Sequence, residues 1–481
     1  MINFRIVLFF IGILISYLGI AMALPLLIEI KNSDINATNF LISTLLTLFF
    51  GISLILAFKE EEKKINVKDT ILITTLSWPI MIILSSLPFY LDVNCENYID
   101  AVFEATSGLT TTGATVYEEV ETLSSGILIW RALLQWLGGL GIIVFAIAII
   151  PIFNIGGIKL FTQDWSERPK DLHYRPKEIA KLLGSIYISF TLIILLLLYA
   201  SGLNLFDAFS HALTTIATGG FSTKSSSIGH YNNFFTELII IFGMLAASLP
   251  FTLYIACFRK NFTSLFDSQV LLFFSLIIFF VTSLALWVHF NNNINIFLAF
   301  RLSLFNSISI MTGTGYSTEN FSNWGYFSNT IFLIMMLIGG CSGSTTGGLK
   351  IFRIQVLWAL VIKELKTIRS PRAVSNINLK NININENIIN SVMIIFFCVL
   401  FSIFFIASVF VYYGYDFITS ISAAVTSISV VGPGLGNIIG PEESFAQLPN
   451  VLKLLLLFGM VLGRLEYLAF LIILAPKFWI K

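Results

Sequence analysis

The chain has 481 residues, of which 56% are hydrophobic and 11% are charged, and its formal net charge is +1. A soluble protein carries about a quarter charged residues, so this composition excludes an ordinary soluble enzyme or binding domain. The near-neutral charge, with no basic patch interleaved with aromatic residues, gives no sign of a nucleic-acid partner.

The apolar residues fall in long runs that indicate an integral membrane protein, because about 20 apolar residues cross a bilayer as a helix. Ten such runs lie near 6–28, 38–58, 70–91, 124–152, 183–202, 235–257, 268–290, 327–362, 388–413 and 450–475. The first run has no clear small-residue cleavage site, so we expect a retained helix rather than a signal peptide. Four shorter apolar stretches suit re-entrant segments rather than spans, and they lie at 98–112, 204–218, 297–312 and 416–431.

The basic residues orient these spans. Of the 28 Lys and Arg residues, 22 lie in segments 59–69, 153–181, 258–267, 350–386 and the two termini. By the positive-inside rule these segments are cytoplasmic, so both termini are cytoplasmic and the four short stretches open on the outside. The first outer segment, 92–123, has seven acidic residues and no Lys or Arg. It is either a solvated loop or a vestibule that concentrates cations.

The four short stretches form an internal repeat. They end in "SGLTTTGATV", "ATGGFST", "TGTGYST" and "GPGLG", which align on Gly113, Gly220, Gly315 and Gly432. Each lies between two spans, so the unit is helix, half-helix, extended loop and helix. We therefore predict an all-α polytopic membrane protein with four pseudo-symmetric helix–pore loop–helix repeats around a central pore, plus two extra N-terminal transmembrane helices. The expected units are the N-terminal pair 1–66 and repeats 67–160, 161–262, 263–380 and 381–481.

The loops are candidates for an ion filter. Unpaired backbone carbonyls within a membrane are tolerated where they line a cavity, and a ring of carbonyls can replace the water around a cation. Glycine permits positive φ, which lets successive carbonyls point to one axis. The candidate filter residues are Thr111, Thr112, Gly113, Thr218, Gly219, Gly220, Thr314, Gly315, Val431 and Gly432. The alternative is four glycine-containing turns that bind no ion.

Two further features are candidate gate elements. The run 327–362 is interrupted by "GGCSGSTTGG", whose glycines oppose helix: Gly339, Gly340, Gly343, Gly347 and Gly348. We expect an unwound segment here, and the alternative is close helix packing through small residues. Arg464 lies within the last apolar run, where a charge usually faces a cavity or a partner; the alternative is an arginine that snorkels to the interface. Glu466 is a poor partner for it on a helix, and Arg131 and Lys453 are interpreted as anchors near helix ends.

These motifs, together with "GGCSGSTTGGLKIFR" (339–353) and "GRLE" (463–466), resemble the Trk/Ktr/HKT superfamily of potassium transporters, most closely its TrkH branch. The resemblance covers about residue 70 to the end, and the two extra N-terminal spans also match TrkH. It implies potassium preference, since every repeat has the filter glycine. It also implies that segment 339–348 obstructs the permeation path and moves on activation, and that Arg464 is a barrier or gate element beneath the filter. The fourth loop departs from the pattern, with Pro433 after its glycine, which implies looser selectivity than in a symmetric tetrameric channel.

The resemblance further implies a homodimer in the cytoplasmic (inner) membrane and a cytosolic ring of nucleotide-binding TrkA-type subunits. Segments 153–181 and 350–380 are the candidate docking surfaces. The chain itself has no Walker motif, so we expect no organic cofactor and K⁺ only as the substrate. We expect no enzyme activity, because no HExxH, paired carboxylates or nucleophile motif lies where such groups could act together.

The expected function is therefore potassium uptake through a carbonyl filter. Whether uptake is channel-like or coupled symport stays open. The alternative is a sodium-permeable or ion-coupled secondary transporter, which the common orientation of the repeats and the scarcity of acidic residues within the spans argue against.

Overall fold

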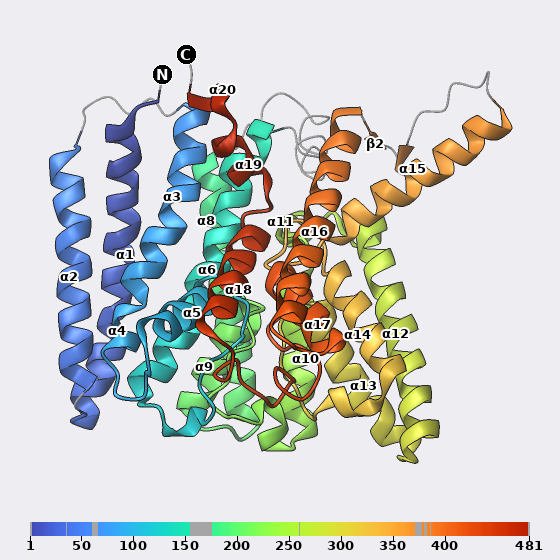
Figure 1. Ribbon diagram of the computed structural model, residues 1–481, viewed down its shortest axis with the longest axis horizontal. Coiled ribbons are helices and arrows are strands. Elements are labelled where there is room, and N and C mark those ends of the chain that lie inside the picture. Colours follow the sequence, from blue (N-terminus) through green and yellow to red (C-terminus); the bar gives the residue numbers. More distant parts are fainter. Residues whose placement is uncertain are drawn as a thin grey trace.

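The computed structural model describes residues 2–34, 36–59, 66–153, 176–258, 260–370, 378–379, 382–384 and 386–479. In this part of the chain the fold is helical apart from a two-residue antiparallel pair, β1 (Asn378–Leu379) and β2 (Ile382–Asn383). Among the residues listed above, six helices are long and apolar enough to cross a membrane, or seven when one bent pair is counted as a span. Both termini lie on the same face of the molecule (Figure 1).

Two long helices stand at one edge of the molecule, α1 (Phe4–Asn32) and α2 (Asn36–Ala57) (Figure 1). They approach closely at glycines, because a Cβ added to Gly12 would lie 2.8 Å from Leu54 and one added to Gly19 would lie 2.9 Å from Leu48. Small residues of this kind let helix backbones pack tightly in lipid, where dispersion replaces the hydrophobic effect as the main attraction.

After this pair the order long helix, short helix, loop, helix occurs four times. The four long first helices are α3 (Val67–Ser85, followed by the short α4, Leu87–Tyr90), α8 (Pro176–Ala200), α12 (Ser268–Asn292) and α16 (Glu386–Tyr412). The four short helices are α5 (Tyr98–Leu109), α9 (Leu205–Ile216), α13 (Ile296–Met311) and α17 (Phe417–Ser429). All ten predicted runs and all four predicted short stretches thus correspond to helices or to broken helices, and the predicted fold class is confirmed.

Within the described ranges, the last helix of the unit is unbroken in the first unit and broken in the other three. It is α6 (Ser125–Phe153) in the first unit, then α10 (Phe234–Ser248) with α11 (Phe251–Phe258), α14 (Tyr326–Ile338) with α15 (Ile351–Arg369), and α18 (Asn450–Arg464) with α19 (Leu468–Leu474) and α20 (Pro476–Trp479). The sequence predicted the break after α14. It did not predict the 90° bend between α10 and α11, next to Pro250, or the break after α18, where Glu466 and Tyr467 have positive φ.

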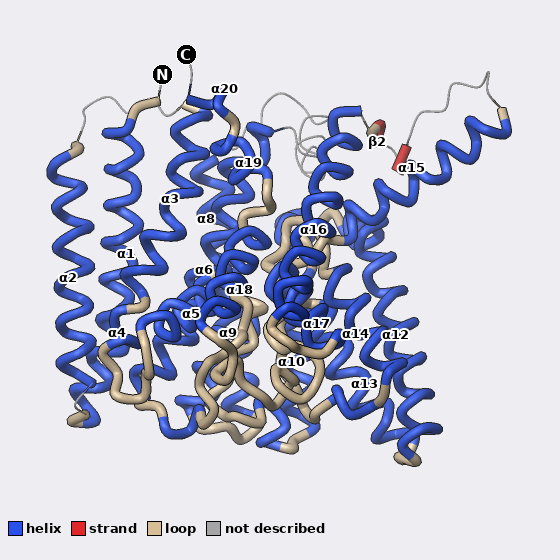
Figure 2. The backbone as a smooth tube through the Cα atoms, in the orientation of Figure 1, coloured by secondary structure: helices blue, strands red, loops and turns tan. Residues whose placement is uncertain are grey.

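Loop segments collect in two places (Figure 2). Most lie on the face opposite the termini, and a second group lies between the helices in the interior. The predicted unit boundaries at 160/161 and 380/381 lie outside the described residues, and the others remain predictions. The 66/67 boundary separates α2 from α3, and the 262/263 boundary falls within a 3₁₀ turn, η3 (Phe262–Phe266).

Candidate functional site

Each short helix begins at an Asn or Asp that caps it. The Asn97 side chain accepts a hydrogen bond from the Asp100 amide at 3.1 Å, and Asn204 accepts one from the Asp207 amide at 2.7 Å. Asn97 and Asn204 also donate their side-chain amides to the carboxylates of Asp100 and Asp207, so the two side chains of each pair hold each other at the start of the helix. The Asp that recurs 13 residues before the glycine in the first two repeats therefore fixes where the helix starts.

Each short helix ends in the same hydrogen-bonded turn. Just beyond each helix an amide donates to a carbonyl five residues back: Thr112 to Ser107 (2.8 Å), Gly219 to Thr214 (2.9 Å), Thr314 to Ser309 (2.9 Å) and Val431 to Thr426 (3.1 Å). This is the Schellman arrangement, which needs one residue in the left-handed region between the two. The chain leaves each helix through this turn and enters the loop with a defined direction.

The left-handed residue in this turn is glycine in only one repeat. Gly313 serves there in the third loop, whereas Thr111 (φ 57°), Thr218 (φ 51°) and Val430 (φ 58°) serve in the others. β-Branched residues rarely adopt this conformation, which costs about 1–3 kcal/mol at each position. Strain repeated at equivalent positions is typical of a functional site whose surroundings enforce it.

Two residues later each loop has a second left-handed residue, and it is the aligned glycine. The φ angles are 88° at Gly113, 79° at Gly220, 84° at Gly315 and 107° at Gly432. In an extended chain successive carbonyls point to opposite sides, and a positive φ at alternate residues reverses every second one. The carbonyls of each loop can therefore face a common side, next to the negative ends of four helix dipoles.

The four loops form a closed ring. A Cβ on Gly113 would meet the Gly219 carbonyl, one on Gly220 the Thr314 carbonyl, and one on Gly315 the Val431 carbonyl. A Cβ on Gly432 would lie 2.7 Å from the Thr112 carbonyl, which returns to the first loop. Each loop therefore touches the next, and all ten residues predicted for the filter lie in this ring.

The fourth loop has the same backbone as the others although its sequence differs. Val430 and Gly432 take the positive-φ positions, and the turn hydrogen bond from Val431 is present. The departure is confined to the space beside the ring, where a Cβ on Gly315 would lie 2.7 Å from Cδ of Pro433. The backbone repeat is thus fourfold, and the side chains around it are not.

The glycine-rich segment 339–350 between α14 and α15 lies directly against this ring. Its Thr345 hydroxyl lies 3.1 Å from the Thr218 hydroxyl and 3.2 Å from the Ala247 carbonyl. A Cβ on Gly347 would meet the Ser429 carbonyl, and one on Gly340 would lie 2.7 Å from Oγ1 of Thr346. The segment also pairs with the bend between α10 and α11, through the Phe251 amide and the Gly343 carbonyl at 3.0 Å.

Arg464 joins this segment to the first repeat. Its side chain is 3% exposed, and it donates to the Thr345 carbonyl at 3.0 Å and to the Gly138 carbonyl of α6 at 3.4 Å. Among the described residues Nε of Arg464 has no acceptor and the side chain forms no ion pair. A buried positive charge therefore lies on the side of the ring that the glycine-rich segment covers.

Glu466 does not pair with Arg464, as expected for a residue only two positions further along the chain, and it pairs with other residues instead. It forms ion pairs with Lys350 (2.6 Å), the last residue of the glycine-rich segment, and with Arg353 in the first turn of α15. Lys350 and Arg353 are buried, and Glu466 lies in the break after α18. The ion cluster thus ties two broken helices to each other at the end of the glycine-rich segment.

Replacement of Glu466 by Gln should lower the stability of the protein by about 1–3 kcal/mol, because two buried cations would lose their anionic partner. Thermal unfolding in detergent micelles measures the change. The exposed loop carboxylate Glu118 provides the control as Glu118→Gln. Equal melting temperatures for the two variants would contradict a structural role for this cluster.

Arg131 and Lys453 lie near the starts of α6 and α18, as predicted, but their interpretation as anchors is wrong. Both are 2% exposed and each has a buried acidic partner, Glu104 at 2.7 Å and Asp100 at 2.6 Å. These carboxylates belong to the acidic segment 92–123, of which Asp92 is also buried. Only the remaining four acidic residues are exposed, so neither the solvated loop nor the vestibule describes the whole segment.

Two of the loops that follow the ring carry carboxyl groups with shifted pKa values. Partial burial and the nearby Glu442 carboxylate raise the pKa of Glu319 above its ordinary value. Partial burial also opposes ionisation of Glu121, but hydrogen bonds from Ser225 outweigh it and lower the pKa of that carboxyl group. Both residues follow ring loops in the chain.

Sequence reasoning missed several side chains that hold the ring. The Tyr316 hydroxyl lies 2.5 Å from that of Thr214, which joins the third loop to the second short helix. Gln135 of α6 donates to the Gly219 carbonyl at 2.6 Å and accepts from the Phe221 amide at 3.1 Å. The opposite charges of Glu104 and Arg131, which lie in neighbouring apolar segments, could have indicated a buried ion pair in advance. Gln135 and Tyr316 carried no comparable signal.

Comparisons with known proteins agree with this geometry. The TrkH family model, described as a cation transport protein, matches residues 36–480. The chain is 36% identical over 469 residues to the Trk system potassium uptake protein TrkI of Halomonas elongata, covering 96% of this chain and 94% of that protein. It is 33% identical over 488 residues to the Trk system potassium uptake protein TrkH of Vibrio parahaemolyticus, covering 99% of each. The crystal structure of the potassium transporter TrkH from Vibrio parahaemolyticus superposes with a TM-score of 0.91 at 31% identity, covering 99% of this chain and 100% of that one.

Proposed function

This chain belongs to the TrkH family of cation transport proteins, and from that premise we propose that it takes up potassium across the cytoplasmic membrane. The observation that carries the proposal is the closed ring, in which the aligned glycine of each loop abuts a carbonyl of the next loop. Such a ring can take the place of the water around a monovalent cation. The relatives with more than 30% identity named above are described as potassium uptake proteins.

In this proposal the ring residues bind K⁺ through backbone carbonyls. They are Thr111, Thr112, Gly113, Thr218, Gly219, Gly220, Thr314, Gly315, Val431 and Gly432. Strained backbone at Thr111, Thr218 and Val430 supports this role, because it holds the carbonyls in place before an ion arrives. K⁺ is the substrate, and the chain acts as a transporter rather than as an enzyme.

The gate is the glycine-rich segment with Arg464. Segment 339–348 lies against the ring, and its glycines have no Cβ that would restrict a change of backbone conformation. Arg464 holds the segment through the Thr345 carbonyl and opposes cations by its charge. Opening requires that this contact be broken or moved.

The proposed orientation places both termini and α15 in the cytoplasm, with the outer loops on the opposite side. The basic residues support it through the positive-inside rule, and α15 projects from the body on the face that carries the termini (Figure 1). A cytosolic nucleotide-binding subunit of the TrkA type would regulate the gate, and the transporter would be a homodimer. Of the two docking segments, the described residues are 153, 176–181, 350–370 and 378–379.

Ion flux into liposomes that contain the purified protein tests the proposal. We expect K⁺ and Rb⁺ to enter at least ten times faster than Na⁺ and Li⁺, since the ring should fit the larger ions. Protein-free liposomes provide the background. Na⁺ entry as fast as K⁺ entry would favour a sodium-permeable transporter, and uptake that requires a proton or sodium gradient would favour coupled transport.

A further inference from the structure

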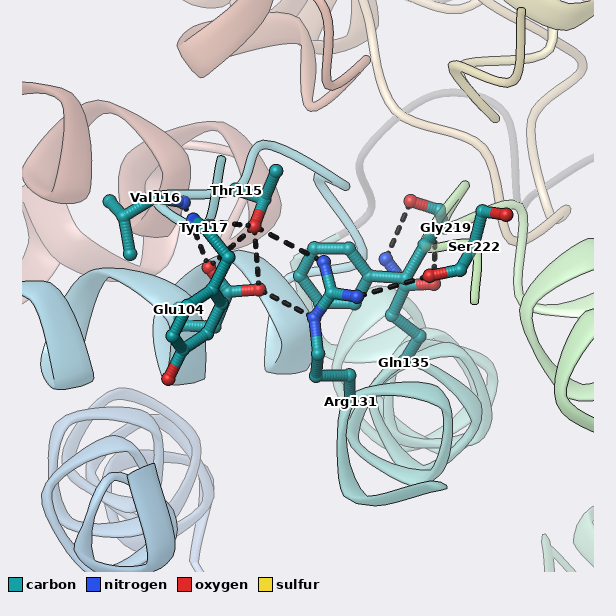
Figure 3. A network of polar contacts seen from close by, with 9 residues as sticks. Glu104, Thr115, Val116, Tyr117, Arg131, Gln135, Gly219 and Ser222 are labelled. Carbon is teal, nitrogen blue, oxygen red and sulfur yellow. Dashed lines mark hydrogen bonds and ion pairs between the residues drawn. The ribbon is translucent and has the colours of Figure 1, made fainter. Parts of the chain in front are cut away.

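A buried ion pair lies beside the ring, between α5 and α6 (Figure 3). Nε of Arg131 is 2.7 Å from Oε1 of Glu104, and the two side chains are 2% and 0% exposed. Burying two charges is expensive, and such a pair is often no more stabilising than apolar residues of the same volume. A contribution to stability alone therefore does not explain its presence, and its other contacts show what it holds.

The remaining polar atoms of this pair contact two different loops. Nη1 of Arg131 donates to the Ser222 carbonyl at 3.1 Å, and its guanidinium lies 4.1 Å from the centre of the Phe221 ring. Nη2 donates to the Thr115 hydroxyl at 3.2 Å. Figure 3 shows the guanidinium between Glu104 and Thr115 on one side and Ser222 on the other.

Glu104 holds the first loop from its own side. Its carboxylate accepts from the Val116 amide at 3.0 Å and from the Thr115 hydroxyl at 3.1 Å. Gln135, one helical turn after Arg131, contacts the second loop at Gly219 and Phe221. The pair and Gln135 thus fix the first loop just after its glycine, and the second loop from just before its glycine to just after it.

The other repeats use uncharged contacts or a histidine at the corresponding place. The position nine residues before the aligned glycine is Glu104, His211 and Asn306 in the first three repeats. His211 contacts the Ser222 hydroxyl at 3.0 Å, and Asn306 donates to the Thr318 hydroxyl at 3.0 Å. In the fourth repeat the position is Ala423, and Ser422 accepts from the Leu435 amide at 2.9 Å instead. Among the described residues only the first repeat has a carboxylate–guanidinium pair there.

We propose that Arg131 is a positioning residue for ion selectivity, because it sets the spacing between the first and second loops. The inference rests on the proposed function. A ring that prefers K⁺ must resist closing around a smaller cation, and charge-assisted hydrogen bonds are stronger than neutral ones. Lysine would keep the charge at this position but cannot contact Glu104, Thr115 and Ser222 in one plane.

The experiment measures the ratio of K⁺ to Na⁺ flux in proteoliposomes for Arg131→Lys and Thr115→Val. We expect the ratio to fall at least fivefold in Arg131→Lys. It should fall about two- to threefold in Thr115→Val, because this variant keeps the ion pair with Glu104 but loses the hydrogen bond from Arg131 to the Thr115 hydroxyl. The control is the double variant Lys453→Met and Asp100→Asn. It removes the other buried ion pair of the first repeat, which joins α18 to the N-terminal end of α5. The control should keep the wild-type ratio even if less protein folds.

The ratio separates positioning from folding, because a smaller folded fraction lowers both fluxes equally. If both variants keep a ratio within 1.5-fold of wild type, or if the control variant loses the ratio as much as Arg131→Lys does, the inference is overturned. If Arg131→Lys does not fold, Thr115→Val decides alone. If the proposed function is wrong, the wild-type protein will conduct K⁺ no faster than Na⁺. In that case there is no ion preference that Arg131 could influence.

Discussion

Gly113→Ser should reduce the preference for K⁺ over Na⁺ at least tenfold, which corresponds to about 1.4 kcal/mol of lost discrimination. Gly113 has a φ of 88°, and a Cβ there would meet the carbonyl of Gly219 in the next loop. The side chain must displace either its own loop or its neighbour, so the spacing of the carbonyls changes at one side of the ring. Flux of K⁺ and Na⁺ in proteoliposomes gives the ratio directly.

The matched controls are Gly202→Ser and Gly414→Ser. These glycines also have positive φ, 104° and 91°, but nothing lies within 4 Å of an added Cβ. They carry the backbone strain of the substitution without the collision, so their flux ratio should equal that of the wild type. A wild-type ratio in Gly113→Ser, or an equal loss in the controls, would contradict the assignment of Gly113 to the filter.

Arg464→Ala should raise the basal K⁺ flux by about tenfold in the absence of any partner. The substitution removes a buried positive charge and the hydrogen bond to the Thr345 carbonyl that holds the glycine-rich segment. Two unit charges 4 Å apart repel by about 4 kcal/mol at an effective dielectric constant of 20, so even partial relief affects the rate. Flux at zero added nucleotide or partner is the measurement.

Arg464→Lys separates the two effects of this side chain. Lysine keeps the charge but cannot reach both the Thr345 and Gly138 carbonyls as the guanidinium does. Low flux in Arg464→Lys would identify the charge as the main barrier, and high flux would identify the hydrogen bonds. The exposed Arg369→Ala on α15 controls for a general effect of removing arginine. Unchanged flux in Arg464→Ala would reduce Arg464 to a structural role.

The sequence alone determined the helices, the repeat and the members of the ring. A membrane helix can be predicted from its own run of apolar residues, because its formation depends on the length and hydropathy of that run. The glycines at the aligned positions indicate where the backbone takes a positive φ, and this conformation is the same in all four loops. For this reason even the divergent fourth loop, with Val430 and Pro433, was correctly aligned by its glycine.

Only the tertiary structure decided which groups meet. Lys453 pairs with Asp100 across 353 positions, and Glu466 with Lys350 across 116, and neither separation carries a local signal. Arg131 was interpreted from its position in one helix, whereas its contacts come from three segments that pack around it. Pairing of distant side chains depends on how helices pack and on which charges must be buried together, and that is fixed by the whole fold rather than by any one stretch of the chain.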